Sequence, residues 1–101
     1  MSIKKQYLKN KPVCKVTLSI PQELANSARK AALVGEFNDW DQNATPMKKS
    51  KKGLFQTSIN LQKDSSYQFR YLLDGNHWEN EPEADEEVPN FIGDTNSLIH
   101  V

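Results

Sequence analysis

The sequence predicts an all-β protein, an antiparallel β-sandwich of about seven strands. Apolar and polar residues alternate in several short runs, a pattern typical of half-buried strands. Turn signals separate these runs at short intervals. The 101 residues contain no repeat, heptad or long amphipathic helix. A chain of this length suits one domain with one core.

The first strand is expected over residues 13–20, where Cys14, Val16, Leu18 and Ile20 alternate with polar residues. Cys14 is the only cysteine, so the chain has no internal disulfide. Its place in the alternation predicts a small core residue rather than a nucleophile.

Pro21 ends this strand, and residues 22–30 predict a loop with at most one helical turn because their apolar content is low. Residues 31–36 are expected to form the next strand. Residues 45–49 predict a short edge strand, a position that suits Pro46 because proline cannot donate a hydrogen bond to a neighbouring strand.

Two further runs are expected to carry the aromatic core. Residues 54–61 place Phe55, Thr57, Ile59 and Leu61 on one face. Residues 67–74 give the clearest alternation. Its expected inward residues are Tyr67, Phe69, Tyr71 and Leu73, and its expected outward residues are Gln68, Arg70 and Leu72.

Asp74-Gly75 is a strong hairpin signal, so Trp78 is expected to lie on the return strand. Residues 98–101 predict a short closing strand. We therefore expect residues 12–101 to form the sandwich and residues 1–11 to form a basic N-terminal segment.

The formal net charge is zero, which gives no support for binding to nucleic acid or to a membrane. Charge is unevenly distributed, with lysines before residue 20 and over 48–52, and acids over 79–87. We interpret these runs as solvated loops. No apolar segment is long enough to cross a bilayer. Residues 1–8 lack the apolar centre of a signal peptide, so a cytoplasmic protein is expected.

The sequence offers little for catalysis. His77 and His100 lack zinc-site spacing, and the four glycines form no phosphate loop. The calcium-like start at Asp74 lacks the glycine that such a loop needs. The acids over 79–87 can supply a carboxylate pair for glycoside hydrolysis, but a small sandwich offers no cleft around both. We expect no catalytic residue, metal or cofactor.

Trp40 and Trp78 instead stand among turn-forming and polar residues. Trp40 follows Asn38 and Asp39 and precedes Gln42, which suit a turn and a polar rim. An exposed indole with polar neighbours is what a sugar site requires, because the apolar face of glucose packs on the ring and its hydroxyls need hydrogen bonds. Alternatively, each indole closes an end of the sandwich core.

Three motifs resemble a known family: "VGEFNDW" from residue 34, "YQFRYLLDGNHWENEP" from residue 67 and "IGDTNSLIHV" from residue 92. They are similar to the glycogen-binding domain of the AMP-activated kinase β subunit. They also resemble the early-set domains of isoamylases and glycogen branching enzymes, together the family-48 carbohydrate-binding modules. Small stand-alone early-set proteins belong to the same group, and the chain is most similar to these.

The resemblance implies an immunoglobulin-like early-set sandwich that binds α-1,4-linked glucan, such as glycogen, starch or a maltooligosaccharide, without catalysis. In the family two tryptophans stack on glucose rings, a basic residue and an asparagine contact hydroxyls, and an aliphatic residue wedges into the glucan. The matching carbohydrate-binding residues are Trp40, Arg70, Trp78, Ile92 and Asn96.

The chain departs from the family at several positions. Arg70 replaces a lysine, Asp94 replaces a threonine, and the turn before Trp78 carries one extra residue. Many early-set domains of enzymes bind no sugar on their own. The alternative function is therefore an interaction module that docks on an α-glucan-active enzyme, such as a glycogen-metabolising enzyme, or self-associates.

Overall fold

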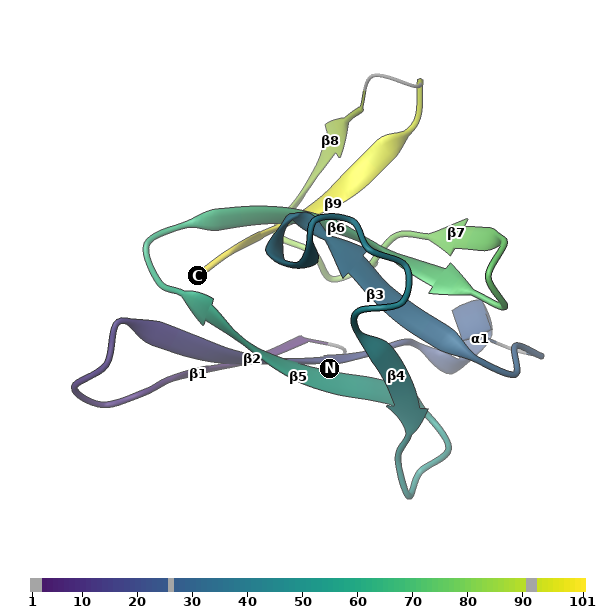
Figure 1. The fold of residues 1–101 in the computed structure, drawn as a ribbon, viewed down its shortest axis with the longest axis horizontal. Coiled ribbons are helices and arrows are strands. Elements are labelled where there is room, and N and C mark those ends of the chain that lie inside the picture. The colour runs from purple at the N-terminus through teal and green to yellow at the C-terminus, as the bar shows by residue number, and fades with distance from the viewer. Residues whose placement is uncertain (1–2, 26, 91–92) are drawn as a thin grey trace.

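The computed structural model describes residues 3–25, 27–90 and 93–101. In this part of the chain nine strands and two short helical turns follow one another (Figure 1). The elements are β1 (Ile3–Tyr7), β2 (Val13–Ser19), α1 (Gln22–Ala25), β3 (Ala31–Gly35), η1 (Glu36–Asn38), β4 (Pro46–Lys49), β5 (Phe55–Gln62), β6 (Ser66–Leu73), β7 (His77–Glu79), β8 (Glu86–Pro89) and β9 (Thr95–His100).

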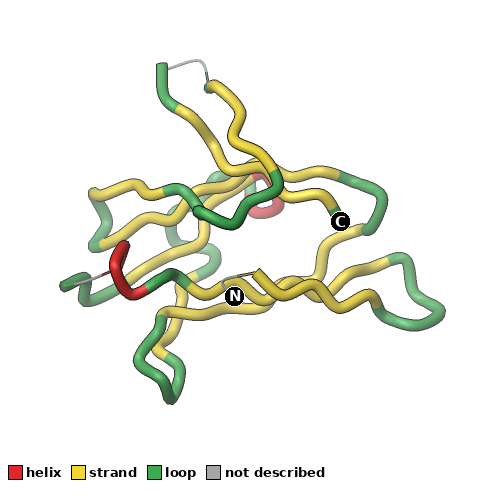
Figure 2. The backbone as a smooth tube through the Cα atoms, turned by 180° about the vertical axis from the view of Figure 1, so that it is seen from behind, coloured by secondary structure: helices red, strands yellow, loops and turns green. Residues whose placement is uncertain are grey.

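The strands form one antiparallel sheet that curls on itself, with the order β1-β2-β5-β4-β3-β6-β9-β8 and with β7 paired to β6. Its two halves face each other as the layers of a sandwich, and Figure 2 shows both layers from behind. The all-β antiparallel prediction is therefore confirmed. No described helix has the length and hydropathy needed to cross a membrane.

Strand β4, which the sequence predicted as a short edge strand, joins the two layers. Its first half pairs with β3 through Ala31 and Met47, and its second half pairs with β5 through Lys49 and Phe55. The strand passes from one layer to the other and joins them. Pro46 is tolerated at its start, where proline disturbs the ladder least.

Strands β1 and β8 were not predicted. Each lies at an end of the sheet order, and each is short and rich in charged residues. Polar edge strands are common because they discourage pairing with other chains, and they lack the apolar alternation of a half-buried strand. β1 lies within the basic segment 1–11 and pairs with β2 over its whole length.

The core lies between the layers and contains the residues that the alternation predicted. Cys14, Val16, Phe69 and Tyr71 are fully buried, and Ile59 packs against this cluster from a partly buried position. Strand β6 is the central element because all five residues from Phe69 to Leu73 are buried. Arg70 and Leu72, which were expected to point outward, are covered on that outer side.

One acid of the 79–87 run is also buried, contrary to the solvated-loop interpretation. Glu81 is 1% exposed, and its Oε1 accepts a hydrogen bond of 2.7 Å from the Tyr71 hydroxyl. Burial, followed by the charge of Glu81, raises the pKa of Tyr71 far above its usual value. The hydroxyl therefore stays a donor and anchors the segment after β7 to the core.

Replacing Tyr71 by phenylalanine is expected to lower the free energy of unfolding by about 1–3 kcal/mol, because a buried carboxylate loses a donor. Urea unfolding measures this change. Tyr67→Phe is the matched control, since its hydroxyl makes only a long, exposed contact of 3.4 Å with the Gln62 carbonyl. Equal losses in the two variants would show that the Tyr71–Glu81 bond contributes nothing special.

Candidate functional site

The segment from Gly35 to Trp40 leaves β3 and turns sharply toward the outer side of β6. Gly35 has no room for a side chain, because a Cβ there would lie 2.6 Å from the Gln68 carbonyl oxygen and 2.7 Å from the Phe69 Cβ. Phe37 packs toward the core, with its ring centroid 6.3 Å from that of Phe69. These two residues hold the start of the turn against β6.

Asn38 closes this turn. Its Oδ1 accepts a hydrogen bond from the Gly35 N–H (3.0 Å), and its Nδ2 donates to the Leu33 carbonyl (2.9 Å) and to the Thr45 hydroxyl (3.0 Å). The side chain thus ties the end of β3 to the approach of β4. The sequence suggested that Asn38 lies in a turn or at the rim of a site, and its hydrogen bonds show that it stabilises the turn.

Trp40 ends the turn in the left-handed backbone region, with φ of 58°, next to Asp39 with φ of 56°. A bulky residue seldom adopts this conformation, and such strain gathers at functional sites. The Trp40 N–H donates to the Gly35 carbonyl (2.9 Å), which fixes the turn. The side chain is 39% exposed, one of two large apolar side chains exposed in the described structure.

Trp78 reaches the same side of the molecule from β7, where it lies directly opposite Leu72 of β6. It is partly buried. The Arg70 guanidinium lies 5.4 Å from the centroid of its ring, within the range of a cation–π contact. The indole and the guanidinium therefore cover the outer face of β6 together.

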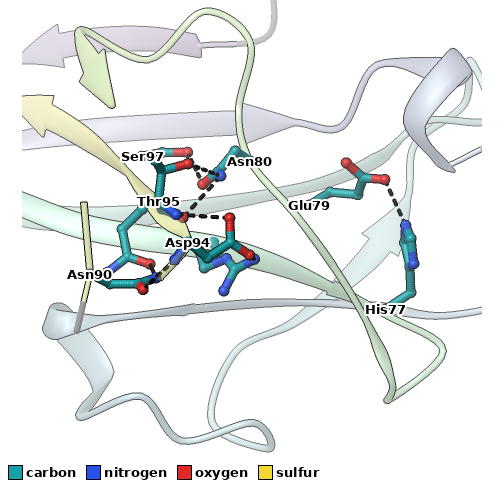
Figure 3. Close-up of polar contacts among 9 residues, drawn as sticks. His77, Glu79, Asn80, Asn90, Asp94, Thr95 and Ser97 are labelled. Atoms are coloured by element: carbon teal, nitrogen blue, oxygen red, sulfur yellow. Dashed lines mark hydrogen bonds and ion pairs between the residues drawn. The ribbon is translucent and has the colours of Figure 1, made fainter. Parts of the chain in front are cut away.

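Asp94 holds the other side of Arg70. Its Oδ2 lies 2.9 Å from Arg70 Nη2, and its Oδ1 accepts a hydrogen bond from the Thr95 N–H at 2.8 Å (Figure 3). The Thr95 N–H, followed by the Arg70 charge, holds the pKa of Asp94 below its usual range. The carboxylate stays charged near neutral pH and keeps Arg70 in place. Arg70 Nε is buried without a hydrogen-bond partner in the described structure.

A chain of amides continues from this pair across β9. Asn90 Oδ1 accepts from the Asp94 N–H (3.0 Å), and Asn90 Nδ2 donates to Asn96 Oδ1 (3.2 Å), as Figure 3 shows in part. Asn96 Nδ2 donates in turn to Gln68 Oε1 (3.0 Å). Asn96 is 8% exposed, and both its amide oxygen and its amide nitrogen are hydrogen-bonded within the protein. Its side chain therefore holds Asn90 and Gln68 in position.

These residues surround one open pocket of about 570 Å³. Four of the five residues implied by the family resemblance lie in its lining. Ile92, the fifth, falls outside the described residues. The complete lining is Trp40, Gln42, Arg70, Trp78, Asn90, Asp94 and Asn96.

Sequence reasoning did not select Asn90. Its role depends on the turn between β8 and β9, where the Asn90 N–H and carboxamide both bond to Asp94. An asparagine four residues before an aspartate is a weak turn signal. Without knowledge of β8, that signal could not be assigned to the pocket.

Two of the acids considered for hydrolysis are engaged by other side chains. Glu81 is buried against Tyr71, and Glu79 Oε2 lies 2.6 Å from His77 Nε2 (Figure 3). The pocket instead offers aromatic surface, amides and one fixed guanidinium. This combination suits the binding of a neutral polyhydroxylated ligand, because rings stack on indoles and hydroxyls bond to amides.

Comparison with known proteins agrees with this chemistry. The family model described as carbohydrate-binding module 48 (isoamylase N-terminal domain) matches residues 21–85, which include Trp40, Arg70 and Trp78. A 1,4-alpha-glucan-branching enzyme of Rhizophagus irregularis is 48% identical over 40 residues. This match covers 40% of the chain and 6% of the enzyme, so the similarity concerns a small part of that protein.

Proposed function

The chain belongs to the carbohydrate-binding module 48 family, and from this premise we propose that it binds α-1,4-linked glucan without acting on it chemically. Glycogen, starch and maltooligosaccharides are the expected ligands. The glucan-branching enzyme matched by part of the chain supports a glucan rather than another polysaccharide. A glycogen-metabolising enzyme is the expected protein neighbour of such a module.

The observation that carries the proposal is the shared pocket of Trp40 and Trp78. An exposed indole binds a glucose ring because its electron-rich face meets the partly positive C–H groups of the sugar. Two indoles at one pocket can hold successive stretches of a curved α-glucan. Buried indoles on separate faces would instead favour a docking module without sugar binding.

Polar groups around the indoles are proposed to form hydrogen bonds with the sugar hydroxyls. Gln42 lines the pocket beside the aromatic rings and provides both donors and an acceptor, whereas the Asn90 amide is held by Asp94 and Asn96. Arg70 is fixed between Trp78 and Asp94, so its guanidinium is already oriented. Asn96 is proposed to act mainly through Asn90. Affinity is expected to be modest, about −4 to −8 kcal/mol, because an open face buries one side of a few rings.

A fluorescence titration tests this proposal. Maltoheptaose and β-cyclodextrin are expected to change the tryptophan emission in a saturable way. Cello-oligosaccharides are the control and should leave it unchanged, because β-linkage straightens the chain away from a curved surface. If no α-glucan alters the emission and none retains the protein on a glycogen resin, the docking-module alternative is favoured.

Arg70→Ala is expected to weaken glucan binding by about 0.5–3 kcal/mol, the range for one hydrogen bond from a neutral or charged donor. Arg70→Lys should recover part of the loss, because it restores the charge but not the planar guanidinium. Arg29→Ala, a cation away from the pocket, is the matched control. Titration calorimetry compares the three variants; equal affinities would remove Arg70 from the site.

We also propose that the module has no hydrolytic activity. Glu79 and Glu81 are engaged by His77 and Tyr71, and Asp94 is ion-paired with Arg70. Incubation with amylose should therefore release no new reducing ends. Release that disappears in a Glu79→Gln or Asp94→Asn variant would contradict this expectation.

A further inference from the structure

The net charge is zero, but lysines and acidic residues are concentrated in different parts of the chain. Residues 1–20 and 46–63 contain ten lysines and no acidic residue, whereas the rest of the chain contains all 13 acidic residues. These two segments supply β1, β2, β4 and β5. The four strands are neighbours in the sheet order, so one end of the sheet forms a basic layer (Figure 1).

The outer side of this layer is a polar surface with exposed lysines on three of its strands. Lys15 of β2 is exposed between buried Cys14 and Val16, so it points away from the core. The register places Lys4 opposite Thr17 and Lys48 opposite Gln56. We call this surface the basic face, and its residues are Lys4, Gln6, Lys15, Thr17, Ser19, Lys48, Gln56, Ser58 and Asn60.

The lysines of the basic layer are almost all without an acidic partner in the described structure. Lys5 is the exception, with its Nζ 2.9 Å from Asp85 Oδ2. Lys49 lies over the Phe55 ring at 5.3 Å. In the other layer, Asp94 bonds to Arg70. The register sets no two lysines directly opposite each other, but their charges add over the layer and create a positive potential that favours a bound anion.

Protection of a sheet edge does not explain the whole cluster. Lysines on an edge strand prevent pairing with other chains, which suffices for Lys4 on β1. Lys48 lies on the half of β4 that pairs only with β5, so edge protection suffices for it as well. Lys15, however, lies on β2, which is paired with β1 on one side and with β5 on the other. Mixed signs would keep the protein equally soluble. The absence of any acid from this layer therefore indicates a negatively charged partner.

We propose that the basic face binds the surface of a bilayer that contains anionic lipid. The cations of the basic face are all lysines, which are flexible, hydrated point charges suited to a diffuse field of phosphates and carboxylates. A protein partner fits less well, because lysine is depleted in protein interfaces and arginine enriched. A single-stranded nucleic acid requires aromatic platforms, which the residues of the basic face do not supply.

The basic face and the glucan pocket lie on opposite sides of the sandwich. Arg70 and Trp78 cover the outer side of β6. This side faces away from the layer that contains β2 and β5. A module bound to a bilayer through its lysines would therefore present its indoles to the solvent. The two binding events are separate, and the lipid proposal does not rest on the glucan proposal.

Vesicle co-sedimentation tests the proposal with the full chain. Wild type is expected to bind phosphatidylcholine vesicles that contain phosphatidylserine, and to ignore pure phosphatidylcholine. Salt should release it, since the screening length falls from about 10 Å at 0.1 M to about 3 Å at 1 M. Lys4→Gln/Lys15→Gln should lower the partition coefficient about 30-fold, as expected for two surface lysines.

The matched control is Arg29→Gln/Lys30→Gln, which changes the net charge equally but lies outside the basic layer, and its effect should be several times smaller. Circular dichroism checks each fold, and Lys4→Gln/Lys48→Gln replaces the first variant if that one unfolds. Equal losses in the two double variants would overturn the proposal. So would a wild type that ignores phosphatidylserine vesicles at low salt, or one that binds a DNA oligonucleotide but no vesicle.

Discussion

Replacing Trp40 by alanine is expected to abolish detectable α-glucan binding while the domain stays folded. Trp40 is 39% exposed and lines the pocket. Its removal takes away a stacking surface that is expected to supply a large part of the binding free energy, which is small in total. The turn that presents it does not depend on the indole, because Asn38 ties that turn through its own amide. Glycogen co-sedimentation and thermal unfolding measure the two effects.

Tyr7→Ala is the matched control for this variant. Tyr7 is the other exposed large side chain of the described structure, 56% exposed, and it lies on β1 in the opposite layer. It should bind glycogen as wild type does. The stacking role of Trp40 is wrong if Trp40→Ala keeps the affinity, or if it unfolds the domain while wild type ignores every α-glucan.

Replacing Phe69 by alanine is expected to lower the free energy of unfolding by about 3–5 kcal/mol, because it leaves a cavity between the layers. Phe69 is fully buried on the central strand, with its ring centroid 5.9 Å from that of Tyr71 and 6.3 Å from that of Phe37. The total free energy of unfolding of a native domain is about 5–15 kcal/mol, so this loss is a large part of it.

Urea unfolding measures this loss, and Phe69→Leu is the control because it keeps most of the apolar volume. It should be clearly more stable than Phe69→Ala. The alanine variant should also bind glucan more weakly, since Phe69 supports Phe37 and Gly35 beneath the Trp40 turn. A loss below about 1 kcal/mol would mean that the core is not organised around this residue.

The sequence predicted the interior of the fold better than its edges. Residues such as Val16 and Phe69 alternate with polar neighbours because one face of each strand is buried, and that alternation is visible in the chain. β1 and β8 are charged edge strands with no such pattern. Strand β4 passes between the layers because it pairs with both β3 and β5. The local sequence of β4 does not indicate these pairings.

The pocket was predictable where a motif fixes a turn. Gly35, Asn38 and Trp40 act within six residues, so their spacing carries the geometry. Arg70 and Asp94 could be named separately, but their ion pair joins β6 to the loop before β9 and becomes visible only in three dimensions. The burial of Glu81 had no signal either, because its partner Tyr71 lies ten residues earlier on another strand.

Chemical-shift mapping of the labelled protein with maltoheptaose tests the central claim most directly. We expect the indole N–H signals of Trp40 and Trp78 and the side-chain amide signals of Gln42 to shift together and to saturate. Signals from the basic face should stay unchanged. Shifts confined to other parts of the sandwich, or no shift with any α-glucan, would contradict the assignment of this pocket as a glucan site.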